Sequence, residues 1–273
     1  MNVDGFCTFL HHPCVIVINT AAVIGKPQKT SLVGYNTKTV STKGYQEMVG
    51  ASFNSVGAEA LNIQDITLVG DAANGTSWIK WWDPATKTYS AKAYYVANFT
   101  DPEDEDEELE YGGWGDEDWY EISKTFAPGE GYWFGAGRNN VGITTAGAVE
   151  KTANQYVGRT VTTKGQQIMV INAFPTTLDI QDIVLDGDGA NGTSWIKWWD
   201  PAAKTYSAKA YYVANFTDPE DEDEELEYGG WADDDWYEIT KSFAVGDGFW
   251  FGAGRNNVTI SFPNPFYVAP VEP

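Results

Sequence analysis

The 273-residue sequence has few of the side chains on which most catalytic and metal sites depend. It contains two cysteines and two histidines, and all four lie within its first fourteen residues. The rest of the chain therefore lacks the imidazole and thiol groups that serve as general bases, nucleophiles and metal ligands. A glycosidase with paired carboxylates remains open, but it needs two acids held at a fixed separation on rigid strands. We predict that the protein is not an enzyme.

Long apolar runs are also missing. No stretch reaches the roughly 18 consecutive apolar residues of a membrane-spanning helix, so we predict no membrane span. The nearest candidate, Val15–Ile24, follows Pro13 and lacks a preceding basic region, which makes it a poor signal peptide. Its β-branched residues favour a strand. Cys7 and Cys14 beside it either form one small disulfide or stay two thiols.

Positive charge is scarce, with 17 Lys and Arg against 39 Asp and Glu. The acids are concentrated, because 101–121 and 218–238 together hold 24 of them and no Lys or Arg. The remainder of the chain is close to neutral. Acidic segments of this kind repel phosphate, which argues against nucleic acid or an anionic membrane as partner.

The densest acidic loop, Asp101–Glu110, recurs unchanged as Asp218–Glu227. Three interpretations remain open: a solvated loop that keeps the protein soluble, a calcium site, and a docking surface for a basic partner. The sequence has no EF-hand spacing, and calcium is the cation that these loops would suit. The candidate cation ligands are Asp101, Glu103, Asp104, Asp106, Asp218, Glu220, Asp221 and Asp223.

An internal repeat sets the domain organisation. Asn74–Trp114 recurs as Asn191–Trp231, with Thr86 replaced by Ala203 as the single difference. A period this long indicates two successive modules and not a solenoid. We predict an N-terminal extension at 1–30, modules at 31–147 and 154–263, a linker at 148–153 and a Pro-rich tail at 264–273.

Short strand patterns fill each module. Residues 45–53 alternate as a strand does, and 61–69 and 119–122 are further strand candidates. Residues 78–96 predict a hairpin that turns at Asp83-Pro84, and 132–143 predict a second hairpin. Since no window has a convincing helical period, we predict an all-β protein made of two tandem modules, each a β-sandwich or jelly roll of seven or eight strands.

Aromatic side chains make up 15% of the sequence, and most of them are expected in the cores. Trp81 and Trp82 are consecutive on one strand and face opposite sides, so one of them is expected to leave its own core. An exposed Trp marks a contact. The ligand-stacking candidates are therefore Trp81, Trp82, Trp198 and Trp199.

The framework resembles a family of secreted bacterial tandem-repeat proteins without assigned function. The resemblance is carried by Val33-Gly34-Tyr35, Lys43-Gly44-Tyr45, Ile63-Gln64-Asp65-Ile66 and Pro128–Phe134. The second copy departs from it, with Arg159 and Gln166 in place of Tyr35 and Tyr45. The resemblance implies secretion and repetition, and hence an extracellular or cell-surface location, but no active site.

These features suggest an extracellular structural protein. We hypothesise that subunits polymerise head to tail into a filament or surface layer, with the N-terminal strand segment pairing with the open sheet edge of the next subunit and the acidic loops outside. The partner would then be the protein itself. The alternative is a monomeric adhesin or carbohydrate-binding protein whose partner is a glycan. The candidate subunit-contact residues are Cys14, Val15, Ile16, Val17, Ile18, Val23, Ile24, Phe266 and Tyr267.

Overall fold

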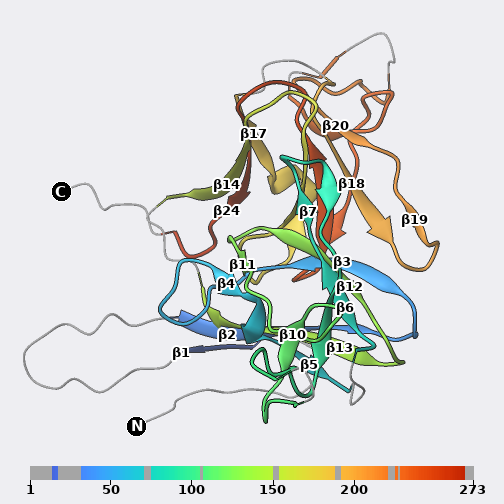
Figure 1. Ribbon diagram of the computed structural model, residues 1–273. Coiled ribbons are helices and arrows are strands. Elements are labelled where there is room, and N and C mark those ends of the chain that lie inside the picture. Colours follow the sequence, from blue (N-terminus) through green and yellow to red (C-terminus); the bar gives the residue numbers. More distant parts are fainter. Residues whose placement is uncertain are drawn as a thin grey trace, which may run out of the picture.

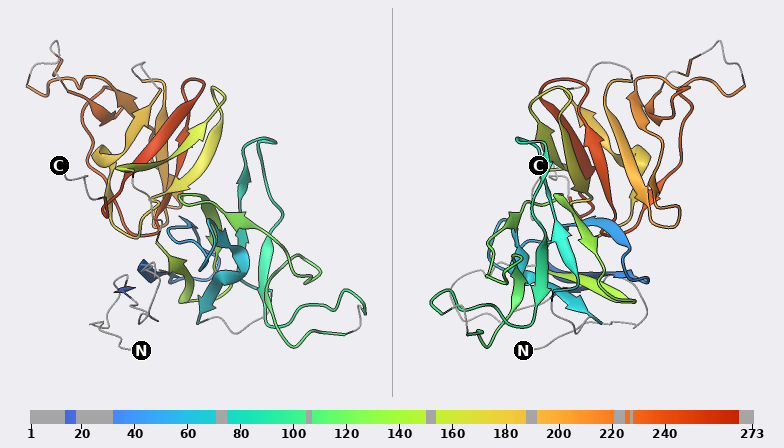
Figure 2. Two further views of the ribbon diagram at one scale, coloured as in Figure 1. Left: turned by 90° about the vertical axis from the view of Figure 1, so that its left-hand side faces the viewer. Right: turned by 45° about the vertical axis from the view of Figure 1, so that its right-hand side comes forward.

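The computed structural model describes residues 14–17, 32–70, 75–104, 107–149, 154–187, 192–220, 225–226 and 228–267. Within these ranges the protein is all-β, with no α-helix and only two short 3-10 turns. The sheets are small and antiparallel, and the four larger ones form a ring-like arrangement (Figures 1 and 2). The prediction of an all-β protein is confirmed.

The first repeat contributes two larger sheets with the strand orders β1–β2–β13–β5 and β10–β9–β6–β12–β3. Strand pairs β11–β4 and β7–β8 complete it. The strands are β1 (Cys14–Val17), β2 (Leu32–Val40), β3 (Gln46–Gly50), β4 (Leu61–Asn62), β5 (Ile66–Val69), β6 (Trp78–Lys80), β7 (Trp82–Asp83), β8 (Thr88–Tyr89), β9 (Ala93–Val96), β10 (Gly113–Gly115), β11 (Thr125–Phe126), β12 (Gly131–Gly135) and β13 (Val141–Ala148), with the 3-10 turn η1 at Ile63–Asp65.

The second repeat reproduces this order as β14–β24–β17 and β15–β23–β18–β20–β21, with β16 paired to β22 and β19 to β18. Only β1 has no counterpart among its described strands. The strands are β14 (Tyr156–Val161), β15 (Gln167–Ile171), β16 (Leu178–Asp179), β17 (Val184–Asp186), β18 (Trp195–Asp200), β19 (Thr205–Tyr206), β20 (Ala210–Val213), β21 (Gly230–Ala232), β22 (Ser242–Phe243), β23 (Gly248–Gly252) and β24 (Val258–Pro263), with the 3-10 turn η2 at Ile180–Asp182.

The hairpin at 78–96 is confirmed, since β6 pairs with β9 and β7 with β8. The Asp83 carboxylate accepts hydrogen bonds from the backbone N–H groups of Ala85 and Thr86, which forms the predicted turn. These backbone hydrogen bonds lower the pKa of Asp83.

The hairpin predicted at 132–143 is wrong. Strand β12 pairs with β3 and β6, whereas β13 pairs with β2 and β5 in the other sheet. The Gly137–Asn140 turn therefore carries the chain between sheets. Adjacent strands with a short turn do not have to pair when each alternates toward a shared core.

Two other strand predictions need correction. Residues 61–69 do not form one strand, because η1 interrupts them where the Gln64 side-chain amide donates to the carbonyl oxygens of Trp114 and Ile122. Residues 119–122 form only an isolated bridge through Glu121. These hydrogen bonds join residues 50 and 58 positions apart, so local alternation does not reveal them.

Each repeat has its own core, centred on a fully buried Trp. The Trp114 indole N–H donates to the Ile66 carbonyl oxygen at 2.7 Å, and Trp231 donates to Ile183 at 2.8 Å. The second core also includes Phe53 from the first repeat and Val149 from the linker between the repeats. The two repeats therefore pack against each other and are not independent units joined only by a linker.

Candidate functional site

Strand β1 is the described part of the predicted subunit-contact segment. It pairs antiparallel with β2 of its own chain, with Cys14 opposite Tyr35 and Val17 opposite Leu32, so the β1 backbone forms the edge of the sheet (Figure 1). The strand predicted at Val15–Ile24 is thus confirmed for Val15–Val17. The predicted contacts Ile18, Val23 and Ile24 and the predicted disulfide partner Cys7 lie outside the described residues.

The predicted contact residues near the C-terminus lie against the second repeat. The Phe266 ring contacts Phe174 with ring centroids 6.1 Å apart, and Phe266 remains 42% exposed. The Tyr267 backbone N–H donates to the Asn264 carbonyl oxygen, which closes a turn after β24. Both residues are therefore placed by contacts within this chain, and their role between subunits stays a prediction.

The described parts of the two acidic loops project from opposite ends of the molecule (Figure 2). The Asp101 and Asp218 carboxylates accept the backbone N–H groups of Glu103 and Glu220, as turn residues do. In the described part of the chain no three His, Cys, Asp or Glu side chains lie together as a metal site would need. The candidate ligands Asp106, Asp221 and Asp223 are outside that part, so the calcium prediction stays untested.

The two repeats contact each other through a cluster of aromatic and Met side chains, which we call the aromatic seam. The Trp82 ring packs edge-on against Trp250, with centroids 5.3 Å apart, and Trp199 packs in the same way against Trp133 at 5.4 Å. The second contact repeats the first with the equivalent residues exchanged between the repeats. This exchange is characteristic of an interface with two-fold symmetry. The seam consists of Met48, Trp78, Trp82, Trp133, Met169, Trp195, Trp199, Tyr206 and Trp250, with Tyr89 against Trp250.

The seam accounts for the predicted split between neighbouring Trp residues. Trp81 packs on the core of the first repeat, while Trp82 leaves that core and contacts the second repeat. Trp198 and Trp199 divide in the same way. What Trp82 and Trp199 contact is therefore the other repeat, and ligand stacking by these four residues stays a prediction.

The two tyrosines at the seam are coupled. The Trp133 and Trp250 indole N–H groups donate to the Tyr89 and Tyr206 hydroxyl oxygens at 3.1 and 3.0 Å. The two hydroxyls also hydrogen-bond each other, and burial raises the pKa of Tyr206 to about 12. Both phenols thus stay neutral at physiological pH and serve as hydrogen-bonding links between the repeats.

The seam is not fully symmetric, and this allows a prediction. The Trp82 indole N–H donates to the Gln167 carbonyl oxygen at 2.9 Å, whereas the buried Trp199 indole nitrogen has no hydrogen-bond partner among the described residues. Trp82→Phe and Trp199→Phe remove the same ring area, but only Trp82→Phe also loses a hydrogen bond. Trp82→Phe is therefore expected to cost about 1 kcal/mol more than Trp199→Phe. Urea unfolding of the two variants measures the difference; equal losses would contradict it.

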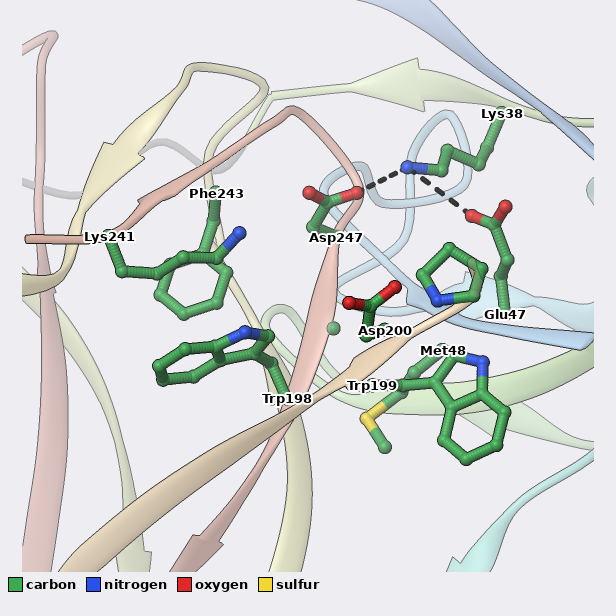
Figure 3. A pocket seen from close by; sticks show the side chains of 11 residues that line it. Lys38, Glu47, Met48, Trp198, Trp199, Asp200, Lys241, Phe243 and Asp247 are labelled. Atoms are coloured by element: carbon green, nitrogen blue, oxygen red, sulfur yellow. Dashed lines mark hydrogen bonds and ion pairs between the residues drawn. The ribbon is translucent and has the colours of Figure 1, made fainter. Parts of the chain in front are cut away.

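A cavity of about 300 Å³ opens beside the seam, between β2 and β3 of the first repeat and β18, β22 and β23 of the second (Figure 3). Its apolar wall comes from Trp198 and Phe243, whose rings meet edge to face at 5.9 Å. Charged groups surround this wall. The charged residues that line the cavity are Lys38, Glu47, Asp200, Lys241 and Asp247.

Lys38 is the central charge of the cavity. Its ammonium group forms ion pairs with Asp247 of the second repeat and with Glu47 of the first, the latter at 3.3 Å (Figure 3). Burial acts to lower the pKa of Lys38, but the two carboxylates more than offset it and the pKa is raised. Burial also raises the pKa of Glu47, even though Lys38 opposes this. Lys38 therefore ties the two repeats together.

The equivalent position on the other side of the seam has different chemistry. Strand register aligns Val40 with Val161, so Arg159 occupies the place of Lys38 and pairs with Glu130 across the repeats at 3.6 Å. Lys124 also binds Glu130, at 2.9 Å. This register corrects the sequence alignment, which matched Arg159 with Tyr35; Tyr156 is the true counterpart.

Sequence reasoning found Trp198 and Trp199 but missed the charged residues of the cavity. Lys38 and Asp247 are 209 positions apart and sit in unremarkable strand and turn contexts. The sequence did show that Gln166 replaces Tyr45 in the second repeat, and each of these residues contacts the other repeat. The Gln166 amide donates to the Pro84 carbonyl oxygen, while Lys204 lies over the Tyr45 ring at 4.3 Å.

Comparison of the chain with protein-family models, curated proteins and solved structures found no match. Within the described residues no helix has the length and apolar character needed to cross a membrane.

Proposed function

We propose that the chain is an extracellular structural protein whose subunits assemble into a filament or surface layer by strand exchange, without catalysis. Each repeat serves as one β-sandwich, jelly-roll-like module, and the aromatic seam fuses the two modules into a rigid building block. The location outside the cell is part of this proposal, and it is supported by the resemblance to secreted bacterial repeat proteins.

The pairing of β1 with β2 is the observation that carries the proposal. Strand β1 is a short edge strand that pairs with β2 at the end of the sheet β1–β2–β13–β5. Its counterpart is missing from the described second repeat, so the fold of a repeat does not require it. An added strand that the module does not need is suited to exchange, because backbone pairing is independent of which chain supplies it.

Deletion of residues 1–28 is expected to abolish assembly while leaving the modules folded. The deletion removes β1 but none of the residues in the two cores or the aromatic seam. Negative-stain microscopy of the full chain is expected to show polymers that the truncated chain does not form, with circular dichroism as the check on folding. Monomers in both samples would reject the proposal.

A second candidate function is glycan binding, and the cavity beside the seam favours it. Trp198 supplies a flat apolar wall with charged hydrogen-bonding groups around it, a combination suited to sugar rings. The volume of about 300 Å³ fits a mono- or disaccharide. This function does not require assembly.

Trp198→Ala is expected to reduce glycan retention at least tenfold if the cavity binds sugar, because the ring wall is lost. Trp81→Ala is the matched control, since Trp81 has the same place in the first repeat. Affinity electrophoresis with a panel of polysaccharides provides the measurement. Equal retention of both variants and the unmodified chain would exclude the cavity as a sugar site.

A further inference from the structure

The contact between Lys38 and Asp247 brings an amine and a carboxyl group together across the two repeats. The Lys38 nitrogen contacts Asp247 Oδ1, and Glu47 Oε2 lies 3.3 Å from the same nitrogen (Figure 3). An amine beside a carboxyl group can form an amide when a third group moves the protons. The three side chains come from β2, β3 and the turn between β22 and β23, so only the folded chain assembles them.

The Asp247 carboxyl group is held in one orientation. Its Oδ2 accepts the backbone N–H of Ala244 at 2.9 Å, which leaves Oδ1 facing Lys38. The turn that carries Asp247 is itself attached to β2, because the Asn36 side-chain amide donates to the Val245 carbonyl oxygen at 3.4 Å. The two reacting groups are therefore positioned before any reaction, which is what an intramolecular condensation needs.

The surroundings of the three side chains limit the access of water. Each of them is at most 27% exposed, and the rings of Trp198 and Phe243 line the same cavity. Weaker hydration makes the ionised forms, which do not condense, less favourable relative to the neutral amine and acid. Burial also raises the pKa of Glu47, so this carboxyl accepts a proton more readily than an exposed one.

The position related by the two-fold symmetry of the seam differs in all three residues. The counterparts of Lys38, Asp247 and Glu47 are, in this order, Arg159, Glu130 and Ile168. The Arg159 guanidinium stays protonated and is not a nucleophile. Ile168 has no group that carries a proton. This side of the seam therefore supports an ion pair alone.

We propose that Lys38 and Asp247 form an intramolecular isopeptide bond, with Glu47 as the proton carrier. Glu47 first moves one proton from the Lys38 ammonium to Asp247, which gives a neutral amine and a carboxylic acid. The amine attacks Asp247 Cγ and forms the Nζ–Cγ bond. Glu47 then moves a second proton from this nitrogen to Oδ1, the Cγ–Oδ1 bond breaks and water leaves. Ammonium and carboxylate become amide and water, and Glu47 ends in its starting form.

The bond joins positions 209 residues apart and locks the two repeats together. Holding both groups in one folded chain can supply an effective concentration of about 10⁵–10⁸ M, which favours condensation over the separate groups. The inference goes beyond the proposed function and does not depend on assembly. A covalent lock between repeats suits a protein that bears mechanical load, because the seam then resists separation.

The mass of the full chain tests the inference. After denaturation and reduction, the unmodified chain is expected to be lighter than its sequence by one water molecule, and a protease digest is expected to contain the Lys38 peptide linked to the Asp247 peptide. Lys38→Arg keeps the positive charge but cannot form the amide, so it is expected to lose no water. Arginine is compatible with this position, since Arg159 has the equivalent place.

Two further variants test the proton carrier. Glu47→Gln keeps the size of the side chain and is expected to slow the cross-linking at least tenfold. Circular dichroism checks that this variant is folded. Arg159→Lys is the matched control at the equivalent position, and it is expected to lose no second water, because Ile168 cannot carry the protons.

An unmodified chain with the full mass of its sequence would overturn the inference. A loss of water that persists in Lys38→Arg would also overturn it, because Asp247 precedes Gly248 and can lose water by closing a succinimide on the backbone. Cross-linking of folded Glu47→Gln at the unmodified rate would exclude Glu47 as the proton carrier. Assembly of an uncross-linked chain into polymers would leave the proposed function standing while rejecting the bond.

Discussion

Replacing Trp133 by alanine is expected to lower the free energy of unfolding by about 3–5 kcal/mol, the usual cost of removing a buried Trp. Trp133 is only 4% exposed, and its ring meets Trp199 and Tyr206 of the second repeat. The substitution opens a cavity in the middle of the aromatic seam. Urea unfolding followed by tryptophan fluorescence is expected to show two transitions where the unmodified chain shows one.

A double-mutant cycle attributes this loss to the contact between repeats. Trp133→Ala combined with Trp199→Ala is expected to show a coupling energy of about 0.5–1.5 kcal/mol, as aromatic pairs do. Trp133→Ala combined with Trp198→Ala is the control, since Trp198 packs on the core of its own repeat. Additive losses in the first pair would contradict a seam that couples the repeats.

Lys38→Met is expected to cost about 2–3 kcal/mol at pH 7, because it leaves two partly buried carboxylates without their counter-charge. Glu47 and Asp247 have side chains 16% and 25% exposed, so water compensates only in part. Arg159→Met is the matched control at the equivalent position. Its cost is expected to be smaller, because Glu130 keeps its ion pair with Lys124.

The loss from Lys38→Met is expected to depend on pH. The folded-state pKa of Glu47 is already raised by burial, and without Lys38 it rises further. A carboxyl with a raised folded pKa favours folding below that pKa and opposes it above. The deficit is therefore expected to be largest at neutral pH and to shrink as pH falls toward 4.5. Thermal melts between pH 4.5 and 8 measure this loss. A loss of stability that grows on acidification would contradict the assignment. Glu47→Gln, added to Lys38→Met, is expected to restore part of the stability at pH 7.

The sequence allowed the fold class to be predicted because the signals involved are local. The turn at Asp83-Pro84 and the β-branched strand at Cys14–Val17 depend on neighbours in the chain, and both are confirmed. The pairing of β12 with β3 was not predictable in this way. It depends on which sheet buries the Trp133 strand, and the sequence records only that the strand is apolar on both faces.

The same difference between local signals and contacts of distant residues applies to the candidate sites. The opposed faces of Trp81 and Trp82 follow from strand geometry, so the departure of Trp82 from its own core was predictable. Its destination was not, because a second repeat and open solvent both accept an apolar ring. The cavity around Lys38 escaped prediction for the same reason: its ion pair with Asp247 exists only once the repeats are packed together.

Covalent fusion of two self-complementary halves has a consequence for how this protein can change. In a dimer of identical chains every substitution occurs in both subunits, so a change that is favourable on one side of a two-fold contact is also present on the other side. Here Glu47 has the hydrophobic Ile168 as its counterpart, and Tyr45 has Gln166. A single polypeptide lets the two ends evolve separately, which makes room for a specialised recognition surface on one side while the other keeps the halves joined.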